Sequence, residues 1–132
     1  MGGLPAELSD RLPRDGPPHR KPVFDLAADT EILGAVRGTG RDCAVLTGME
    51  TDVCVLHSAV GLREAGLRVA VVRDAVQSPG DGHEFGLERM RQLGIELVST
   101  KGLFYEWLRT VAAAHEFERE HPEVQPPDDL VL

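Results

Sequence analysis

The stretch that decides the fold is residues 44–55, which are Ala-Val-Leu-Thr-Gly-Met-Glu-Thr-Asp-Val-Cys-Val. The first three residues form an apolar run, Gly48 interrupts it, and an apolar helical pattern begins near Val53. A strand, a tight turn and a helix are therefore predicted within this one stretch. Cys54 falls in the first helical turn, where free backbone N–H groups and the positive end of the helix dipole favour a thiolate. Placement alone leaves a second interpretation, a buried cysteine packed under a sheet.

Helices and strands alternate along the rest of the chain. Short loops between such elements predict a Rossmann-like α/β/α domain with a parallel sheet covered by helices. Right-handed crossovers would place the three strands side by side in sequence order. Because its first strand is mostly apolar, we expect that strand to be covered on both faces. The predicted helices are 30–36, 53–64, 81–93 and 103–117, and the predicted strands are 43–47, 68–73 and 95–99. Asp29 or Thr30 is expected to cap the first helix, and Thr51 or Asp52 the second. The expected buried positions of the last two helices are Leu87, Met90, Leu93, Phe104, Trp107, Leu108 and Val111.

The ends of the chain have a different composition from the middle. Residues 1–22 contain five prolines and three glycines, which predict an irregular segment rather than a helix or a ladder strand. The α/β domain is expected over residues 23–117. Three further prolines in residues 118–132 predict an extended tail.

Length and charge narrow the classes of function. A chain of 132 residues suits one domain with a real core. Its net charge is −8 without a basic cluster, which argues against nucleic acid and anionic membranes as partners. No apolar run is long enough to span a bilayer, and the N-terminus lacks the apolar core of a secretory signal. Cys43 and Cys54 should lie at opposite ends of a strand, too far apart for a disulfide, so we expect two free thiols and a cytoplasmic location.

Gly48–Val55 resembles the hallmark of the isochorismatase-like cysteine hydrolases, which include nicotinamidases and isochorismatases. That hallmark is a strand, then Gly-x-x-Thr-Asp-x-Cys-Val, then a helix, and this chain matches it at every defined position. The likeness continues through Val69–Ala75 and Gly86–Ser99. Upstream, Lys21 and Phe24 are similar to a Lys-x-x-Phe segment of that family.

The resemblance implies a site built on an Asp, Lys and Cys triad. Cys54 would be the nucleophile, and Lys21 the lysine that favours its thiolate. The Met49–Glu50 peptide bond would be cis, and the backbone N–H groups of Glu50 and Cys54 would form an oxyanion hole. The substrate would be a small amide, carbamoyl or vinyl-ether compound.

The chain departs from the family pattern at the aspartate. In the family this residue ends a first strand, whereas Asp10 and Asp15 stand among prolines and glycines with no apolar run before them. We therefore expect the first β-α-β portion of the fold, including a central strand, to be missing. No aspartate, metal or cofactor is assigned. The 43–47 strand would then be an edge, so we expect a homo-oligomer.

Several other polar residues near the motif have two interpretations. His57 shares a helix face with Cys54, as in a Cys–His dyad, but packing or capping is the favoured interpretation. His83 is expected in the loop after the second strand, where it is a candidate for contact with substrate. Asp74 is expected to end that strand and to bond a turn. Glu50 would face either the pocket or water.

We therefore expect a small-molecule hydrolase that acts through Cys54. The alternative is a catalytically impaired member of the same family that serves as an interaction domain or as a thiol that responds to oxidants.

Overall fold

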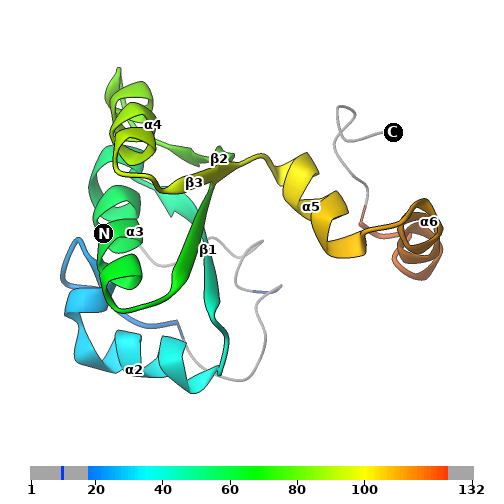
Figure 1. The fold of residues 1–132 in the computed structure, drawn as a ribbon, viewed down its shortest axis with the longest axis horizontal. Coiled ribbons are helices and arrows are strands. Elements are labelled where there is room, and N and C mark those ends of the chain that lie inside the picture. The colour runs from blue at the N-terminus through cyan, green and yellow to red at the C-terminus, as the bar shows by residue number, and fades with distance from the viewer. Residues whose placement is uncertain (1–9, 11–17, 125–132) are drawn as a thin grey trace.

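The computed structural model describes Asp10 and residues 18–124. It contains a three-stranded parallel sheet flanked by helices, which confirms the predicted α/β class (Figure 1). The elements in chain order are the 3-10 turn η1 (Leu26–Ala28), α2 (Thr30–Gly38), β1 (Cys43–Met49), the π-helical turn η2 (Thr51–Val55), α3 (Leu56–Glu64), β2 (Arg68–Gln77), α4 (Gly82–Gln92), β3 (Glu96–Val98), α5 (Thr100–Leu108) and α6 (Val111–Glu120).

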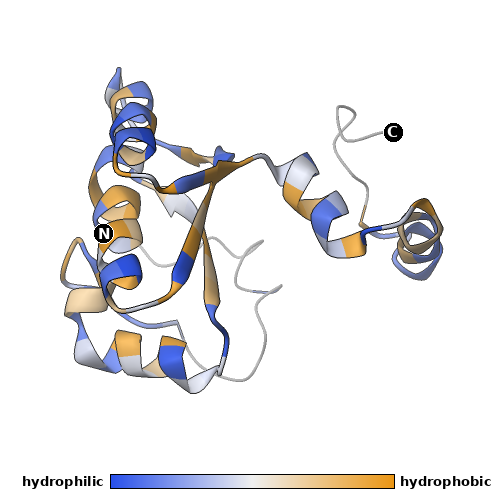
Figure 2. Ribbon diagram, viewed as in Figure 1, coloured by the Kyte–Doolittle hydropathy of each residue, from blue (hydrophilic) through white to orange (hydrophobic). Residues whose placement is uncertain are grey.

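The core lies between β2 and the helices α3 and α4. The sheet order is β1-β2-β3, as predicted, so β2 is central, and its residues 69–72 are all buried. In Figure 2 the hydrophobic colours follow β2 and α3, whereas α4 is mainly hydrophilic. Leu87 and Met90 of α4 are buried as predicted, but Leu93 is 38% exposed because it follows the last helical residue. The other buried core residues include Leu56, Ala59, Leu62 and Ile95.

Strand β1 is not covered on both faces, so that prediction is wrong. Val45 is 36% exposed and Met49 is 64% exposed. The reason is position: β1 is at the edge of the sheet, and β2 is its one strand neighbour among the described residues. An apolar sequence therefore makes a strand here without making a buried one.

Strand β2 runs four residues further than predicted, to Gln77 instead of Arg73. Its pairing with β1 shifts between Leu46 and Gly48, after which Gly48 pairs with Val76 and Met49 with Gln77. This irregularity lets the two strands continue together past the predicted end. Asp74 therefore lies within β2 and not at its carboxyl end.

The predicted last helix, 103–117, is two helices. Arg109 has a left-handed φ of 65°, which ends α5, and the Thr110 hydroxyl caps α6 by accepting a hydrogen bond from the Ala113 N–H. The two helices form an arm, residues 100–120, that extends away from the sheet (Figure 1). Trp107 and Val111, expected on a buried stripe, are 66% and 61% exposed.

Candidate active site

The turn that carries Cys54 has an unusual backbone. The Met49–Glu50 peptide bond is cis, as the resemblance implies, and Gly48 before it has a left-handed φ of 110°. The following five residues form the π-helical turn η2 instead of an ordinary helix start capped by Thr51 or Asp52. The Glu50 carbonyl accepts hydrogen bonds from the N–H groups of Val53, at 3.3 Å, and Val55, at 3.0 Å. Single π-helical turns occur frequently at functional sites.

Cys54 is half-buried in this turn, immediately before α3. Cys43, the first residue of β1, is also half-buried, and both cysteines are free thiols. The predicted absence of a disulfide between them is confirmed. Cys54 thus combines partial access with a place next to the N-terminus of α3, the setting in which cysteines are reactive.

Thr51, the first residue of the turn, is completely buried and bonded to His83. Its Oγ1 lies 3.1 Å from Nδ1 of His83. His83 was expected in a loop but is the second residue of α4, and its side chain is 19% exposed. Its Nε2 lies 3.9 Å from a carboxylate oxygen of Glu84. The structure thus joins His83 to the motif itself, while its predicted contact with a substrate stays a prediction.

Asp52, the second residue of the turn, is bonded to Ser78, a residue that the sequence analysis missed. The Ser78 hydroxyl donates a 2.6 Å hydrogen bond to the Asp52 carboxylate, and the Asp52 N–H points at the same hydroxyl at 3.5 Å. Ser78 is 1% exposed and directly follows β2. A small polar residue at the end of an apolar strand was the available signal.

Lys21 lies on a segment that is attached to α3. Its ammonium donates to the backbone carbonyls of Val23 and Phe24. Ser58 of α3 holds the same segment, because its hydroxyl donates to the Phe24 carbonyl and accepts from the Leu26 N–H. Lys21 is therefore tied to the helix that begins after Cys54, although its two hydrogen bonds are to carbonyls and not to the thiol.

The remaining candidates have separate places. His57 is exposed and lines a surface pocket of about 250 Å³ with Glu64 of α3 and Arg89 of α4. Asp74 accepts hydrogen bonds from the N–H and hydroxyl of Thr100, so it bonds the start of α5. Glu50 is exposed to water.

Asp10 lies in an exposed turn, and Asp15 lies outside the described residues. Within residue 10 and residues 18–124, no group of three or more His, Cys, Asp or Glu side chains could hold a metal ion. In the same part of the chain, no helix has the length and apolar character needed to cross a membrane.

Residues 4–102 match the family model of the isochorismatase domain. The chain belongs to the isochorismatase family. Isochorismatase family protein 2A of Dictyostelium discoideum is 36% identical over 90 residues, which is 67% of this chain and 40% of that protein. This isochorismatase-family chain therefore spans less than half the length of that relative.

Solved structures of the family show the same fold. The ycaC gene product of Escherichia coli, described as an octameric hydrolase of unknown specificity, matches with a TM-score of 0.76 and 27% identity. That match covers 92% of this chain and 63% of the ycaC chain. The nicotinamidase/pyrazinamidase PncA of Bacillus subtilis matches with a TM-score of 0.55 and 28% identity, over 60% of this chain and 44% of PncA.

Proposed function

We propose that this isochorismatase-family chain hydrolyses a small amide, carbamoyl or vinyl-ether compound with Cys54 as its nucleophile. The observation that carries the proposal is the folded motif, in which a π-helical turn places a half-buried thiol next to the N-terminus of α3. The nicotinamidase likeness supports an amide as the substrate. Lys21 is the proposed cation that favours the thiolate, held near α3 through Ser58.

For an amide, the thiolate would attack the carbonyl carbon and form a C–S bond. The N–H groups of Glu50 and Cys54 would donate to the oxyanion. The C–N bond would break, the amine would leave with a proton, and water would hydrolyse the thioester to an acid and the free thiol. The two proton transfers need a general acid–base group, which is worth about 10²–10⁴-fold. We assign no described residue to it, so we expect slow turnover and ready formation of the covalent adduct.

A panel of nicotinamide-like and carbamoyl compounds tests this proposal. Product release and the mass of the intact protein are followed for the wild type, Cys54→Ala and Cys43→Ala. We expect turnover or adduct formation in the wild type and in Cys43→Ala, and neither in Cys54→Ala. Equal activity in Cys54→Ala and the wild type would refute the role of Cys54.

The exposed apolar residues support self-association as a second part of the proposal. Val45 and Met49 on β1, and Trp107 and Val111 on the arm, leave apolar area in water. The octameric relative also matches at least part of the arm, because a 92% match of 132 residues leaves about 11 unmatched, fewer than the 21 residues of 100–120. We propose that copies of this chain associate through β1 and the arm.

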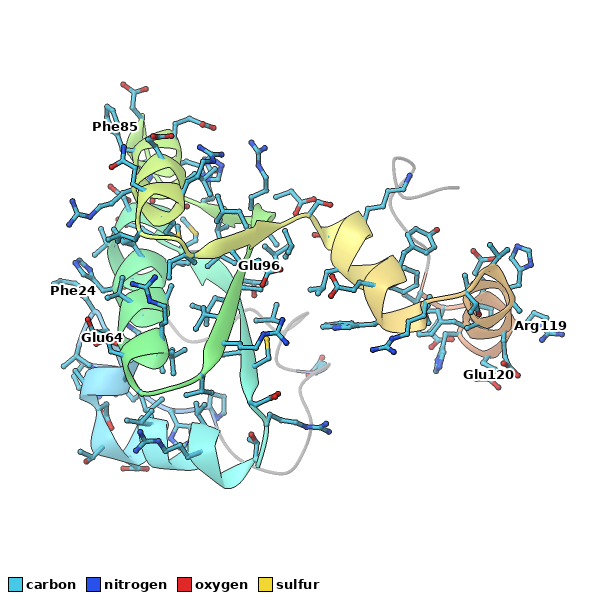
Figure 3. All side chains as sticks on the ribbon, viewed as in Figure 1. Phe24, Glu64, Phe85, Glu96, Arg119 and Glu120 are labelled. Carbon is cyan, nitrogen blue, oxygen red and sulfur yellow. The ribbon has the colours of Figure 1, made fainter. Side chains whose placement is uncertain are left out.

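Light scattering during size-exclusion chromatography measures this association. Val45→Lys and Trp107→Ala should shift the wild-type oligomer toward monomer. Phe85→Ala, which changes an aromatic residue that projects from α4 and is 70% exposed, should leave the oligomer intact (Figure 3). A wild-type chain that is monomeric at high concentration would refute the proposal.

The free thiols also support our proposal of a reducing, cytoplasmic location.

A further inference from the structure

We infer that Ser78, His83 and Gly86 are positioning residues that fix the turn carrying Cys54. The inference rests on the proposed role of Cys54 as nucleophile. Ser78 directly follows β2, and His83 and Gly86 lie in the first half of α4. The three residues contact Thr51 and Asp52, the first two residues of the turn η2. None of the three stands in the Gly-x-x-Thr-Asp-x-Cys-Val motif.

Thr51 and Asp52 are each held by a different side chain. The buried Thr51 hydroxyl reaches His83, and the Asp52 carboxylate receives the Ser78 hydroxyl at 2.6 Å. Thr51 is 0% exposed and Ser78 is 1% exposed, so water cannot replace these partners without a rearrangement. A buried polar group that loses its partner keeps its full desolvation cost, which makes the two contacts specific for one placement of the turn.

Gly86 allows α4 to touch the backbone of the turn. A Cβ atom at this position would lie 2.8 Å from both N and Cα of Asp52 and 2.9 Å from the Thr51 carbonyl carbon. These neighbours are backbone atoms, which cannot rotate away as the end of a long side chain can. Gly82, one turn earlier on α4, lies against the side chain of Asp52, with its Cβ position 2.8 Å from the carboxylate Oδ2. The backbone of α4 therefore packs directly on η2.

The consequence for chemistry follows from the shortness of the turn. Cys54 is two residues after Asp52, so a displaced Asp52 also displaces the Cys54 thiol and N–H. The proposed oxyanion-hole N–H groups of Glu50 and Cys54 flank the fixed pair. Because misplacement by about 1 Å can cost 10²-fold in rate, fixing this pair matters for attack on a carbonyl.

Two reactions of Cys54 separate positioning from simple exposure. With p-nitrophenyl acetate, the thiolate attacks the ester carbonyl, an oxyanion forms, and p-nitrophenolate leaves as the thioester is made. With iodoacetamide, the thiolate displaces iodide and no oxyanion forms. Loss of positioning should slow the first reaction and leave the second near its wild-type rate, whereas general loosening of the fold should speed the second.

A double-mutant cycle on the full chain tests the pair of Thr51 and His83. Thr51→Val and His83→Ala should each slow acylation of Cys54 by about 3- to 10-fold, the loss expected for one hydrogen bond. The double variant should be no slower than either single variant, because both remove the same contact. Thr51→Ser, which keeps the hydroxyl, should restore the wild-type rate. Ser78→Ala should slow acylation to a similar degree, and Ser99→Ala, at the exposed cap of α5, should not.

Gly86→Ala tests the backbone contact, with Gly34→Ala as its matched control. The added Cβ at Gly34 would meet nothing within 4 Å, so that variant should react like the wild type. Gly86→Ala should slow acylation strongly or lower the melting temperature of the chain. Additive effects of Thr51→Val and His83→Ala, or unchanged acylation in both, would overturn the inference while leaving a reactive Cys54. A wild-type Cys54 that reacts with neither reagent would instead overturn the proposed function and this inference with it.

Discussion

β1 and β2 are neighbouring parallel strands with similar apolar sequences, yet their side chains differ in exposure to water. Val45 of β1 pairs with Ala70 of β2, and Leu46 pairs with Val71. Val71 is 0% exposed, while Val45 is 36% exposed. β2 has a strand on each side and helices packed on it, whereas β1 is at the edge. Apolar content therefore makes both segments strands, and the strands and helices packed beside them decide which one forms the core.

Truncation of one valine in each strand should give the largest contrast. Val71→Ala removes two methyl groups from a fully buried site and should lower the free energy of unfolding by about 2 kcal/mol. Val45→Ala makes the same chemical change at the edge and should cost less than about 0.5 kcal/mol. Urea denaturation measures both losses, at a chain concentration low enough to keep the chain monomeric. Equal losses would mean that β1 is as buried as β2 within a single chain, and would contradict the comparison.

A smaller effect is expected where β2 continues beyond the predicted end. There the Asp74 carboxylate accepts hydrogen bonds from the N–H and hydroxyl of Thr100, which joins β2 to the start of the arm. Asp74→Ala should cost about 1 kcal/mol or less, because the site is exposed. It should also speed proteolytic cleavage near residue 100. Asp81→Ala is the control, since the Asp81 side chain caps no N–H of α4. Equal cleavage of the two variants would show that Asp74 does not anchor the arm.

The smallest effect should come from the outer face of α4, far from the buried side of β2. Side-chain hydrogen bonds from Gln92 and then from Arg91 lower the pKa of Glu88 below its usual value of 4.5, against a weaker effect of burial. The folded chain therefore binds this proton more weakly than the unfolded chain does. The resulting stabilisation is present above about pH 4.5 and is lost as the pH falls through the lowered pKa.

Thermal unfolding at several pH values checks this expectation. Glu88→Gln should be slightly less stable than the wild type near neutral pH, and the difference should disappear in acid. A stability difference for Glu88→Gln that grows in acid would contradict the assigned direction of the pKa.

Much of the fold follows from local patterns. The apolar run of β2, the buried pair Leu87 and Met90, and Asp29 as one of the two expected caps of α2 were all predicted, because each depends on residues close in sequence. The edge position of β1 was predicted, but the exposure of its side chains was not, because that exposure depends on which helices cover the faces of the strand. The break at Arg109 was missed because no glycine or proline marks it; the left-handed residue there is an arginine.

In the candidate site too, features that depend on local residues were predicted and contacts from distant residues were not. The local pattern predicted Cys54 at the start of a helix, and the family resemblance implied the cis bond before Glu50. The contacts of Thr51 and Asp52 come from residues 26 to 32 positions away, so no spacing in the sequence could indicate Ser78 or His83 as their partners. Gly86 could not be predicted either, because its role depends on the close approach of the α4 backbone to the backbone of the turn η2.

The most direct test of the central claim compares the two cysteines within one molecule. The wild-type chain is treated with iodoacetamide at mildly acidic pH, and peptide mass spectrometry follows Cys54 and Cys43 over time. Both thiols are half-buried, so exposure alone does not favour either. Cys54 lies in the turn before the N-terminus of α3, a place where cysteines are reactive, whereas Cys43 begins β1, so Cys54 should be labelled well before Cys43. Equal rates, or faster labelling of Cys43, would contradict the assignment of Cys54 as the nucleophile.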